Sequence, residues 1–305
     1  MPTPPSGRQI ELVHDDQRAT ITEVGATVRA YHAGGRPVLE PFALGQMSDA
    51  GRGQLLIPWP NRLADGAYEF DGERYQLPLS EPEKGNAIHG LLRWRHWSVA
   101  AHAAHRAVLT TRLYPMTGYP FLLDLTAMYA LTDTGLTLTI EATNSGERPA
   151  PYGFGQHPYL SPGDGAHVDD CTLELRADTR ILTDDERQLP TGSEPVEGTN
   201  FDFREPKQIG SLEVDHAFTD LARDDNGRAS ARLRGPDGAT AELWVDEACP
   251  LIQIFTGDPL PAERRRTGLG CEPMTCAPNA FNSGDGLVRL EPGQTHRARW
   301  GARLT

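Results

Sequence analysis

The sequence predicts an antiparallel all-β protein built of stacked sheets, and three observations support this prediction. Apolar and polar residues alternate along several segments, as they do in half-buried strands. Clusters of Gly, Pro, Asn and Asp separate these segments at short spacing, which is typical of turns between antiparallel strands. The 305 residues include 31 glycines and 25 prolines, which are costly inside helices, and no long segment shows helical periodicity.

The clearest alternating run is Leu136–Asn144, which reads as one half-buried strand. The run Cys171–Ala177 alternates in the same way, and we expect it to form a second strand. Because no internal repeat and no long linker interrupts the chain, we expect residues 1–305 to form a single domain. Shorter alternating runs cover residues 9–13, 18–22 and 239–245.

The charge balance argues against several kinds of partner. The chain carries 29 basic and 42 acidic residues, a net charge of −13, which repels nucleic-acid phosphates and anionic lipids. We therefore expect no nucleic-acid or membrane partner, and no apolar stretch is long enough to span a bilayer. The N-terminus lacks the basic patch and apolar core of a signal peptide, so we expect a cytoplasmic protein.

Several kinds of catalytic site lack the residues they need. The only lysines, Lys84 and Lys207, lie in polar, loop-like contexts, whereas a Schiff-base lysine needs a desolvated position. The four cysteines form no C-x-x-C pair, so we expect no metal site. The motifs of serine hydrolases, P-loop enzymes and dinucleotide-binding folds do not occur.

Two candidate catalytic side chains stand directly before prolines, in segments that break the alternating pattern. His157 lies within Gly153–Tyr159 and Glu272 within Gly270–Thr275. A following proline favours extended backbone and limits its motion. This restraint would suit catalytic groups, because small displacements of such groups are costly.

Five motifs, in this order, resemble the aldose 1-epimerase (galactose mutarotase) family, and the resemblance runs from about Gly51 to Gly293. The fold it implies is a large twisted antiparallel β-sandwich, the galactose mutarotase-like supersandwich, which agrees with the alternating segments. The motifs are Pro58-Trp59-Pro60-Asn61-Arg62, Asn86-Ala87-Ile88-His89-Gly90, Gly155-Gln156-His157-Pro158-Tyr159, Asp215-His216-Ala217-Phe218 and Cys271-Glu272-Pro273-Met274-Thr275.

The activity that the resemblance implies is interconversion of the α and β anomers of an aldose. A base takes the proton of the anomeric hydroxyl while an acid protonates the ring oxygen, and the roles reverse when the ring closes on the other face. No electron or group is transferred, so we expect neither cofactor nor metal. The expected partner is a small monosaccharide, and the expected assembly is a monomer or homodimer.

The resemblance also implies a role for individual residues. Glu272 is the expected base and His157 the expected acid, with a pKa slightly above the usual 6.5 so that it is protonated at pH 7. His89 is expected near the ring oxygen as a helper. The expected substrate-binding residues are Arg62, Asp215 and Asn61, with Trp59, Tyr159 and Phe281 as possible stacking faces.

Three alternatives stay open at this stage. A glycoside hydrolase would use two carboxylates, but the histidine motifs would then have no explanation. A non-catalytic sugar-binding module of the same fold would need no acid–base pair. A mutarotase for a phosphorylated or sulfonated sugar would need arginines beside Arg62 to meet the anion, and Arg52, Arg93 and Arg95 are the candidates in sequence.

Overall fold

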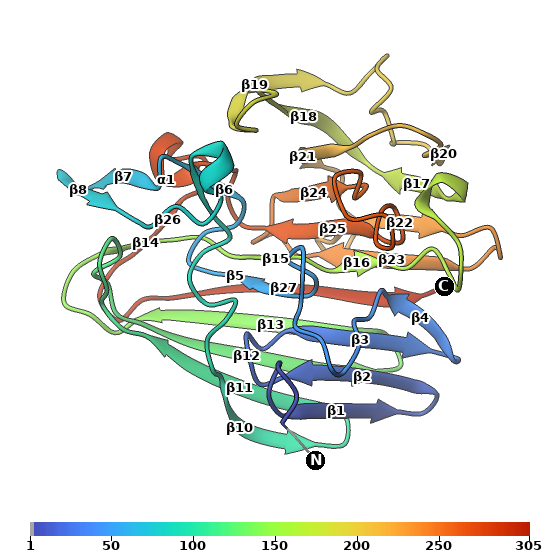
Figure 1. Cartoon of the computed structure of the whole chain (residues 1–305), viewed down its shortest axis with the longest axis horizontal. Coiled ribbons are helices and arrows are strands. Elements are labelled where there is room, and N and C mark those ends of the chain that lie inside the picture. The colour runs from blue at the N-terminus through green and yellow to red at the C-terminus, as the bar shows by residue number, and fades with distance from the viewer. Residues whose placement is uncertain (1–2) are drawn as a thin grey trace.

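A computed structural model describes residues 3–305, and two large antiparallel sheets make up most of it (Figure 1). The first sheet has twelve strands. They are β1 (Gln9–His14), β2 (Gln17–Thr22), β3 (Val28–Ala33), β4 (Arg36–Leu39), β5 (Leu55–Leu56), β15 (Gly155–Gln156), β16 (Tyr159–Leu160), β18 (Ala177–Thr183), β19 (Pro190–Pro195), β21 (Asp215–Leu221), β24 (Leu251–Phe255) and β25 (Leu269–Met274). Their order is β1-β2-β3-β4-β16-β25-β24-β21-β18-β19, and β15 pairs with both β25 and β5.

The second sheet has nine strands, all joined to their neighbours in antiparallel pairs. They are β10 (Ser98–Ala103), β11 (Arg106–Leu113), β12 (Leu123–Thr132), β13 (Gly135–Asn144), β17 (Thr172–Leu175), β20 (Lys207–Gln208), β22 (Ala229–Arg234), β23 (Thr240–Val245) and β27 (Thr295–Leu304). Their order is β10-β11-β12-β13-β27-β23-β22-β17-β20. The predicted antiparallel all-β fold is therefore confirmed.

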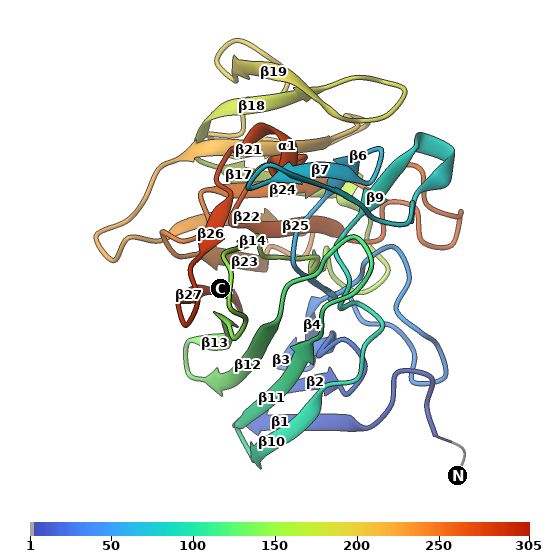
Figure 2. The same ribbon diagram turned by 90° about the vertical axis from the view of Figure 1, so that its left-hand side faces the viewer.

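Short strands and helical turns outside the two large sheets make up the rest of the structure, and Figure 2 shows β6, β7, β9 and α1 among them. The paired strands are β6 (Arg62–Ala64) with β9 (Asn86–Ile88), β7 (Ala67–Phe70) with β8 (Glu73–Gln76), and β14 (Ala150–Tyr152) with β26 (Val288–Leu290). The helical elements are α1 (Ala280–Ser283) and the 3₁₀ turns η1 (Pro82–Lys84) and η2 (Val168–Asp170).

The core lies between the sheets and follows from the alternation in the sequence. On β13 the side chains of Leu136, Leu138 and Ile140 are fully buried, and Leu138 stands opposite Trp300 of β27. Ile10 of β1, in the other sheet, belongs to the same apolar cluster. Because full burial of each such aliphatic side chain stabilises the fold by roughly 1.5–3 kcal/mol, the inward rows hold the two sheets together.

One predicted strand proved to be two. The alternating run Cys171–Ala177 is interrupted at Arg176, where the chain leaves β17 in the second sheet and enters β18 in the first. Both strands direct their apolar side chains, such as Leu175 and Ala177, into the shared core. The alternation of period two therefore continues across the change of sheet, and for this reason the sequence pattern alone could not reveal that the chain changes sheets at Arg176.

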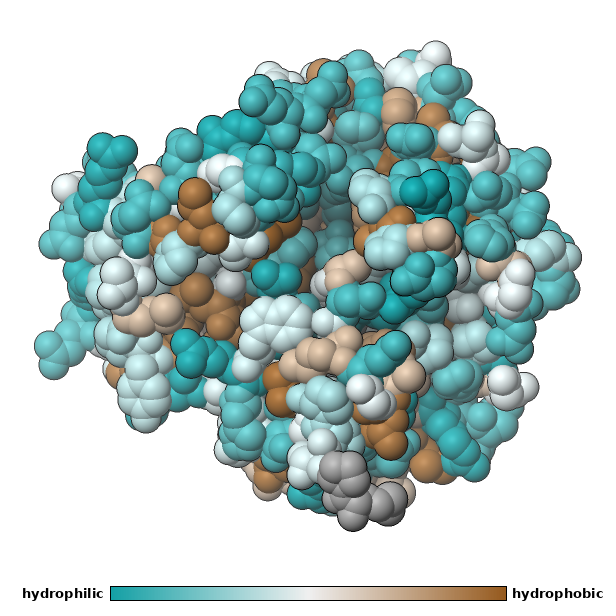
Figure 3. All heavy atoms as spheres, in the orientation of Figure 1, coloured by the Kyte–Doolittle hydropathy of each residue, from teal (hydrophilic) through white to brown (hydrophobic). Residues whose placement is uncertain are grey.

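The surface carries few large apolar groups. Figure 3 shows a face that is mostly hydrophilic, with hydrophobic residues scattered over it. Within residues 3–305 no helix has the length and apolar character that a bilayer crossing requires.

Candidate active site

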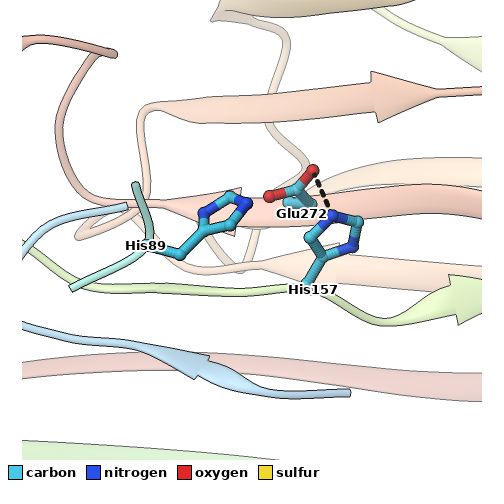
Figure 4. Close-up of side chains that lie close together, drawn as sticks. All are labelled: His89, His157 and Glu272. Carbon is cyan, nitrogen blue, oxygen red and sulfur yellow. Dashed lines mark ion pairs between the residues drawn. The ribbon is translucent and has the colours of Figure 1, made fainter. Parts of the chain in front are cut away.

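The three side chains predicted to be catalytic lie together although they are far apart in sequence (Figure 4). His89 follows β9, His157 lies between β15 and β16, and Glu272 lies in β25, which pairs with β15, β16 and β24. His157 Nε2 is 3.3 Å from Glu272 Oε1, and one donor atom from each of the three residues lies within 4.8 Å of the others. Their exposed fractions are only 8%, 5% and 2%, respectively.

Two backbone hydrogen bonds hold His157 in place, and the backbone of Gly51 lies close against its imidazole ring. Its N–H donates to the carbonyl of Gln54 at 3.1 Å, and its carbonyl accepts from the N–H of Gly53 at 2.8 Å. Gly51 has a φ of +74°, and a Cβ at this position would lie 2.5 Å from His157 Cδ2. Only glycine therefore allows the chain to pass so close to the imidazole.

His89 is fixed by a reciprocal pair of hydrogen bonds with Asn61. The N–H of His89 donates to the carbonyl of Asn61 at 3.0 Å, and the N–H of Asn61 donates to His89 Nδ1 at 3.2 Å. Because Nδ1 accepts, the neutral ring carries its proton on Nε2. His89 therefore presents a hydrogen-bond donor to the site.

Burial shifts the two members of the His157–Glu272 pair in opposite directions. It lowers the pKa of His157 to about 3, and the charges of Arg52 and Arg93 act in the same direction. It raises the pKa of Glu272 well above its usual value, and the charge of Asp215 adds to the effect. The predicted upward shift for His157 is therefore wrong in direction, because the sequence could not show that the pair is buried. Between these two shifted pKa values the pair holds one proton.

A pocket of about 580 Å³ opens over these side chains, and Arg62, Asn61 and Asp215 also line it. This volume lies in the range of small-molecule sites. The guanidinium of Arg62 is paired with Glu81, with Nε–Oε2 at 2.8 Å and Nη2–Oε1 at 3.0 Å. The arrangement directs a fixed set of polar groups at any ligand in the pocket.

Asp215 is held at the pocket wall by two amides. Its Oδ1 accepts from Gln253 Nε2 at 2.6 Å, and its Oδ2 accepts from Gln188 Nε2 at 3.0 Å. The remaining lone pairs of the carboxylate can accept sugar hydroxyls.

The three aromatic residues predicted as stacking faces do not line the pocket. Trp59 and Phe281 are 3% and 4% exposed and pack on each other, with ring centroids 5.6 Å apart. Tyr159 stacks behind the His157 ring at 4.9 Å and donates its hydroxyl to the carbonyl of Ala50 at 2.9 Å. The structure therefore corrects the substrate-contact prediction for Trp59 and Tyr159, because both rings pack inward.

Residues that sequence reasoning missed also line this pocket. Lys84, set aside as a loop lysine, reaches the pocket and contacts the side-chain oxygen of Gln188. The exposed ring of Trp94 and the half-buried ring of Phe255 supply aromatic surface instead of the predicted three. Gln253 holds Asp215 but does not itself line the pocket. The sequence offers one signal for it, because it is a polar residue within the apolar run Leu251–Phe255.

The cluster of His89, His157 and Glu272 resembles a metal ligand set in its spacing. A metal needs a lone pair on His89 Nε2, but the N–H of Asn61 already points at Nδ1 and places the ring proton on Nε2. The donor set therefore does not suit a metal that uses all three residues.

Exhaustive chelation should leave the activity of the purified protein unchanged, and metal analysis should find no stoichiometric zinc. The physical reason is the donor role of His89, which opposes metal ligation. The measurement is turnover before and after dialysis against EDTA, with dialysis against buffer as the control. A loss that added Zn²⁺ restores would contradict this prediction.

Comparisons with known proteins show which proteins this chain is similar to. Residues 8–302 match the sequence model of the family described as Aldose 1-epimerase. The chain is 37% identical over 299 residues to the uncharacterized protein YihR of Escherichia coli, with 96% of this chain and 92% of that protein covered. It is 28% identical to the aldose 1-epimerase of E. coli, with 68% and 63% covered. The structure superposes on the GalM/aldose epimerase homologue from C. elegans with a TM-score of 0.87, at 22% identity and 98% coverage of both chains.

Proposed function

Because the chain belongs to the aldose 1-epimerase family, we propose that it is an isomerase that interconverts the α and β anomers of a monosaccharide. The observation that carries the proposal is the buried His157–Glu272 pair, 3.3 Å apart, with the donor His89 beside it in a pocket of small-molecule size. A pure sugar-binding module gains nothing from a buried acid–base pair, which is costly to desolvate.

The reaction follows from the proton that the pair shares. Sugar hydroxyls that hydrogen-bond to Glu272 stabilise its carboxylate and move the shared proton to His157. Glu272 then takes the proton of the anomeric hydroxyl while His157 protonates the ring oxygen, and the C1–O5 bond breaks to give the open aldehyde. His89 Nε2–H donates to the ring oxygen. Rotation about C1–C2 and the reverse proton transfers close the ring on the other face.

The wider features of the chain support the same proposal. The family match over residues 8–302 favours a single domain. We further propose that this domain acts on a monosaccharide as a monomer or homodimer in the cytoplasm. The net charge of −13 disfavours nucleic-acid and membrane partners. The chemistry consists of proton transfers, so the proposal includes no cofactor.

The test is an anomerisation assay by polarimetry or NMR over neutral, phosphorylated and sulfonated aldoses. Each sugar starts as one pure anomer, and the approach to anomeric equilibrium should accelerate in proportion to protein concentration for at least one of them. The Glu272→Gln variant measures the background. Rates equal to the uncatalysed rates for the whole panel would refute the proposal.

A second candidate substrate class, a sugar carrying a phosphate or sulfonate, is favoured by Arg93. This guanidinium lines the pocket, and in residues 3–305 no carboxylate pairs with it; its Nη2 donates only to the carbonyl of Ile88 at 3.3 Å. Burial lowers the pKa of Arg93 to about 10. Of the other sequence candidates, Arg52 is buried against Glu40 at 2.7 Å, and Arg95 is exposed outside the pocket.

Arg93→Met should lower kcat/KM on anionic aldoses by roughly 10- to 100-fold and on neutral aldoses much less. The expected loss is that of a hydrogen bond to a charged group, about 1.5–3 kcal/mol. Arg95→Met, on the exposed neighbour, is the matched control. An equal loss on neutral and anionic sugars would show instead that Arg93 acts through the catalytic pair.

A further inference from the structure

The turn between β18 and β19 places Gln188, which the proposed mechanism does not use, at the pocket. Asp184 organises this turn: its Oδ1 accepts from the N–H groups of Glu186 and Arg187 at 3.1 and 2.6 Å, and its Oδ2 from that of Leu189 at 2.9 Å. Gln188 itself has a φ of +53°. Residues other than glycine rarely adopt this conformation, and those that do are often found at functional sites.

Arg187 fastens the same turn to the segment Lys84–Asn86. Its guanidinium donates to the carbonyls of Lys84 and Gly85 at 3.0 and 2.8 Å and to Asn86 Oδ1 at 3.2 Å. Asn86, which is fully buried, returns a bond from Nδ2 to the carbonyl of Arg187 at 2.9 Å. Asn86 begins β9, the strand that leads to His89. The position of Gln188 is therefore fixed relative to the catalytic cluster.

The side-chain amide of Gln188 bridges two walls of the pocket. Its Nε2 donates to Asp215 Oδ2 at 3.0 Å, and its Oε1 accepts from the ammonium of Lys84. All three side chains line the pocket. The amide keeps a second N–H and a second oxygen lone pair, and the carboxylate keeps lone pairs of its own.

We propose that Gln188 is a sugar-recognition residue that binds, together with Asp215, two adjacent hydroxyls of the sugar ring. This inference rests on the proposed function. Each sugar hydroxyl donates one hydrogen bond and accepts others, so an amide–carboxylate pair held in place can satisfy a diol of one configuration. An epimer that turns one hydroxyl away leaves a polar group of the protein unpaired, which is the strongest basis for discrimination.

Two variants test the role of the Gln188 side chain without disturbing the backbone of the turn. Gln188→Gly removes the amide and tolerates the positive φ. Gln188→Glu keeps the shape and the contact with Lys84 but replaces the donor to Asp215 with a like charge. Both should raise KM for the best sugar by about tenfold with kcat within about threefold of wild type, and both should narrow the ratio of kcat/KM between epimers. Glu186→Ala, on an exposed side chain of the same turn, is the control and should match wild type.

The outcomes also separate this inference from the proposed function. If kcat falls while KM and epimer preference stay at wild-type values, Gln188 is not a recognition residue. If Gln188→Glu matches wild type, the donor to Asp215 is irrelevant and the inference is overturned. Should wild type anomerise no sugar, calorimetric titration of the same panel decides: weaker binding by Gln188→Gly supports recognition without catalysis, and equal binding, or no binding by wild type, overturns it.

Discussion

Replacing Glu272 with glutamine should lower kcat by at least about 100-fold while the protein stays folded. The amide preserves the shape of a side chain that is 2% exposed, so packing in β25 is retained. It cannot accept the proton of the anomeric hydroxyl, and His157 then has no partner with which to exchange protons across the ring. Turnover is measured by polarimetry, and folding by circular dichroism and thermal melting.

Glu242→Gln is the matched control for this variant. Glu242 is also a glutamate on a central strand, β23, and is 3% exposed, but it pairs with Arg303 and does not line the pocket. Its substitution should affect stability more than kcat. Turnover of folded Glu272→Gln close to that of wild type would remove Glu272 from the role of base.

The sequence predicted the sheets well because their inward rows are continuous. Leu136–Asn144 was expected as a strand and forms β13, which begins one residue earlier at Gly135. The break at Arg176 was missed, because both strands beside it face the same core. Alternation reports which face is buried, and it does not report which sheet a strand joins.

The sequence motifs were enough to predict the candidate catalytic residues, but they could not predict the features of the site that depend on three-dimensional geometry. His89, His157 and Glu272 were identified from their motifs, and the structure brings them together. The direction of the His157 pKa shift depends on burial, which a loop motif does not reveal. Gln188 stands in a polar turn, and only its hydrogen bonds and its left-handed backbone single it out.

The pH profile tests the shared proton directly. A pair that binds two protons has no base, and a pair that binds none has no acid, so kcat/KM should be bell-shaped. The acid limit of the profile, where the pair takes up its second proton, should fall below the ordinary carboxyl pKa of 4.5, because burial lowers the pKa of His157 to about 3. Burial also raises the pKa of Glu272 well above its usual value, so the pair should keep its last proton to a higher pH than a free carboxyl would, and the alkaline limit should move upward. The two apparent limits belong to the pair as a whole and not to either residue alone.

The two histidines should respond differently to the same substitution. His157→Asn should remove most of the rate together with the alkaline limb, because Glu272 then has no partner that carries the shared proton. His89→Asn should lower the rate and keep the bell, because His89 donates a hydrogen bond through a proton that the N–H of Asn61 holds on Nε2. Profiles measured from about pH 2 to 10, over the range in which the protein stays folded, compare the three forms. An alkaline limb that is lost in His89→Asn and kept in His157→Asn would exchange the roles of the two residues.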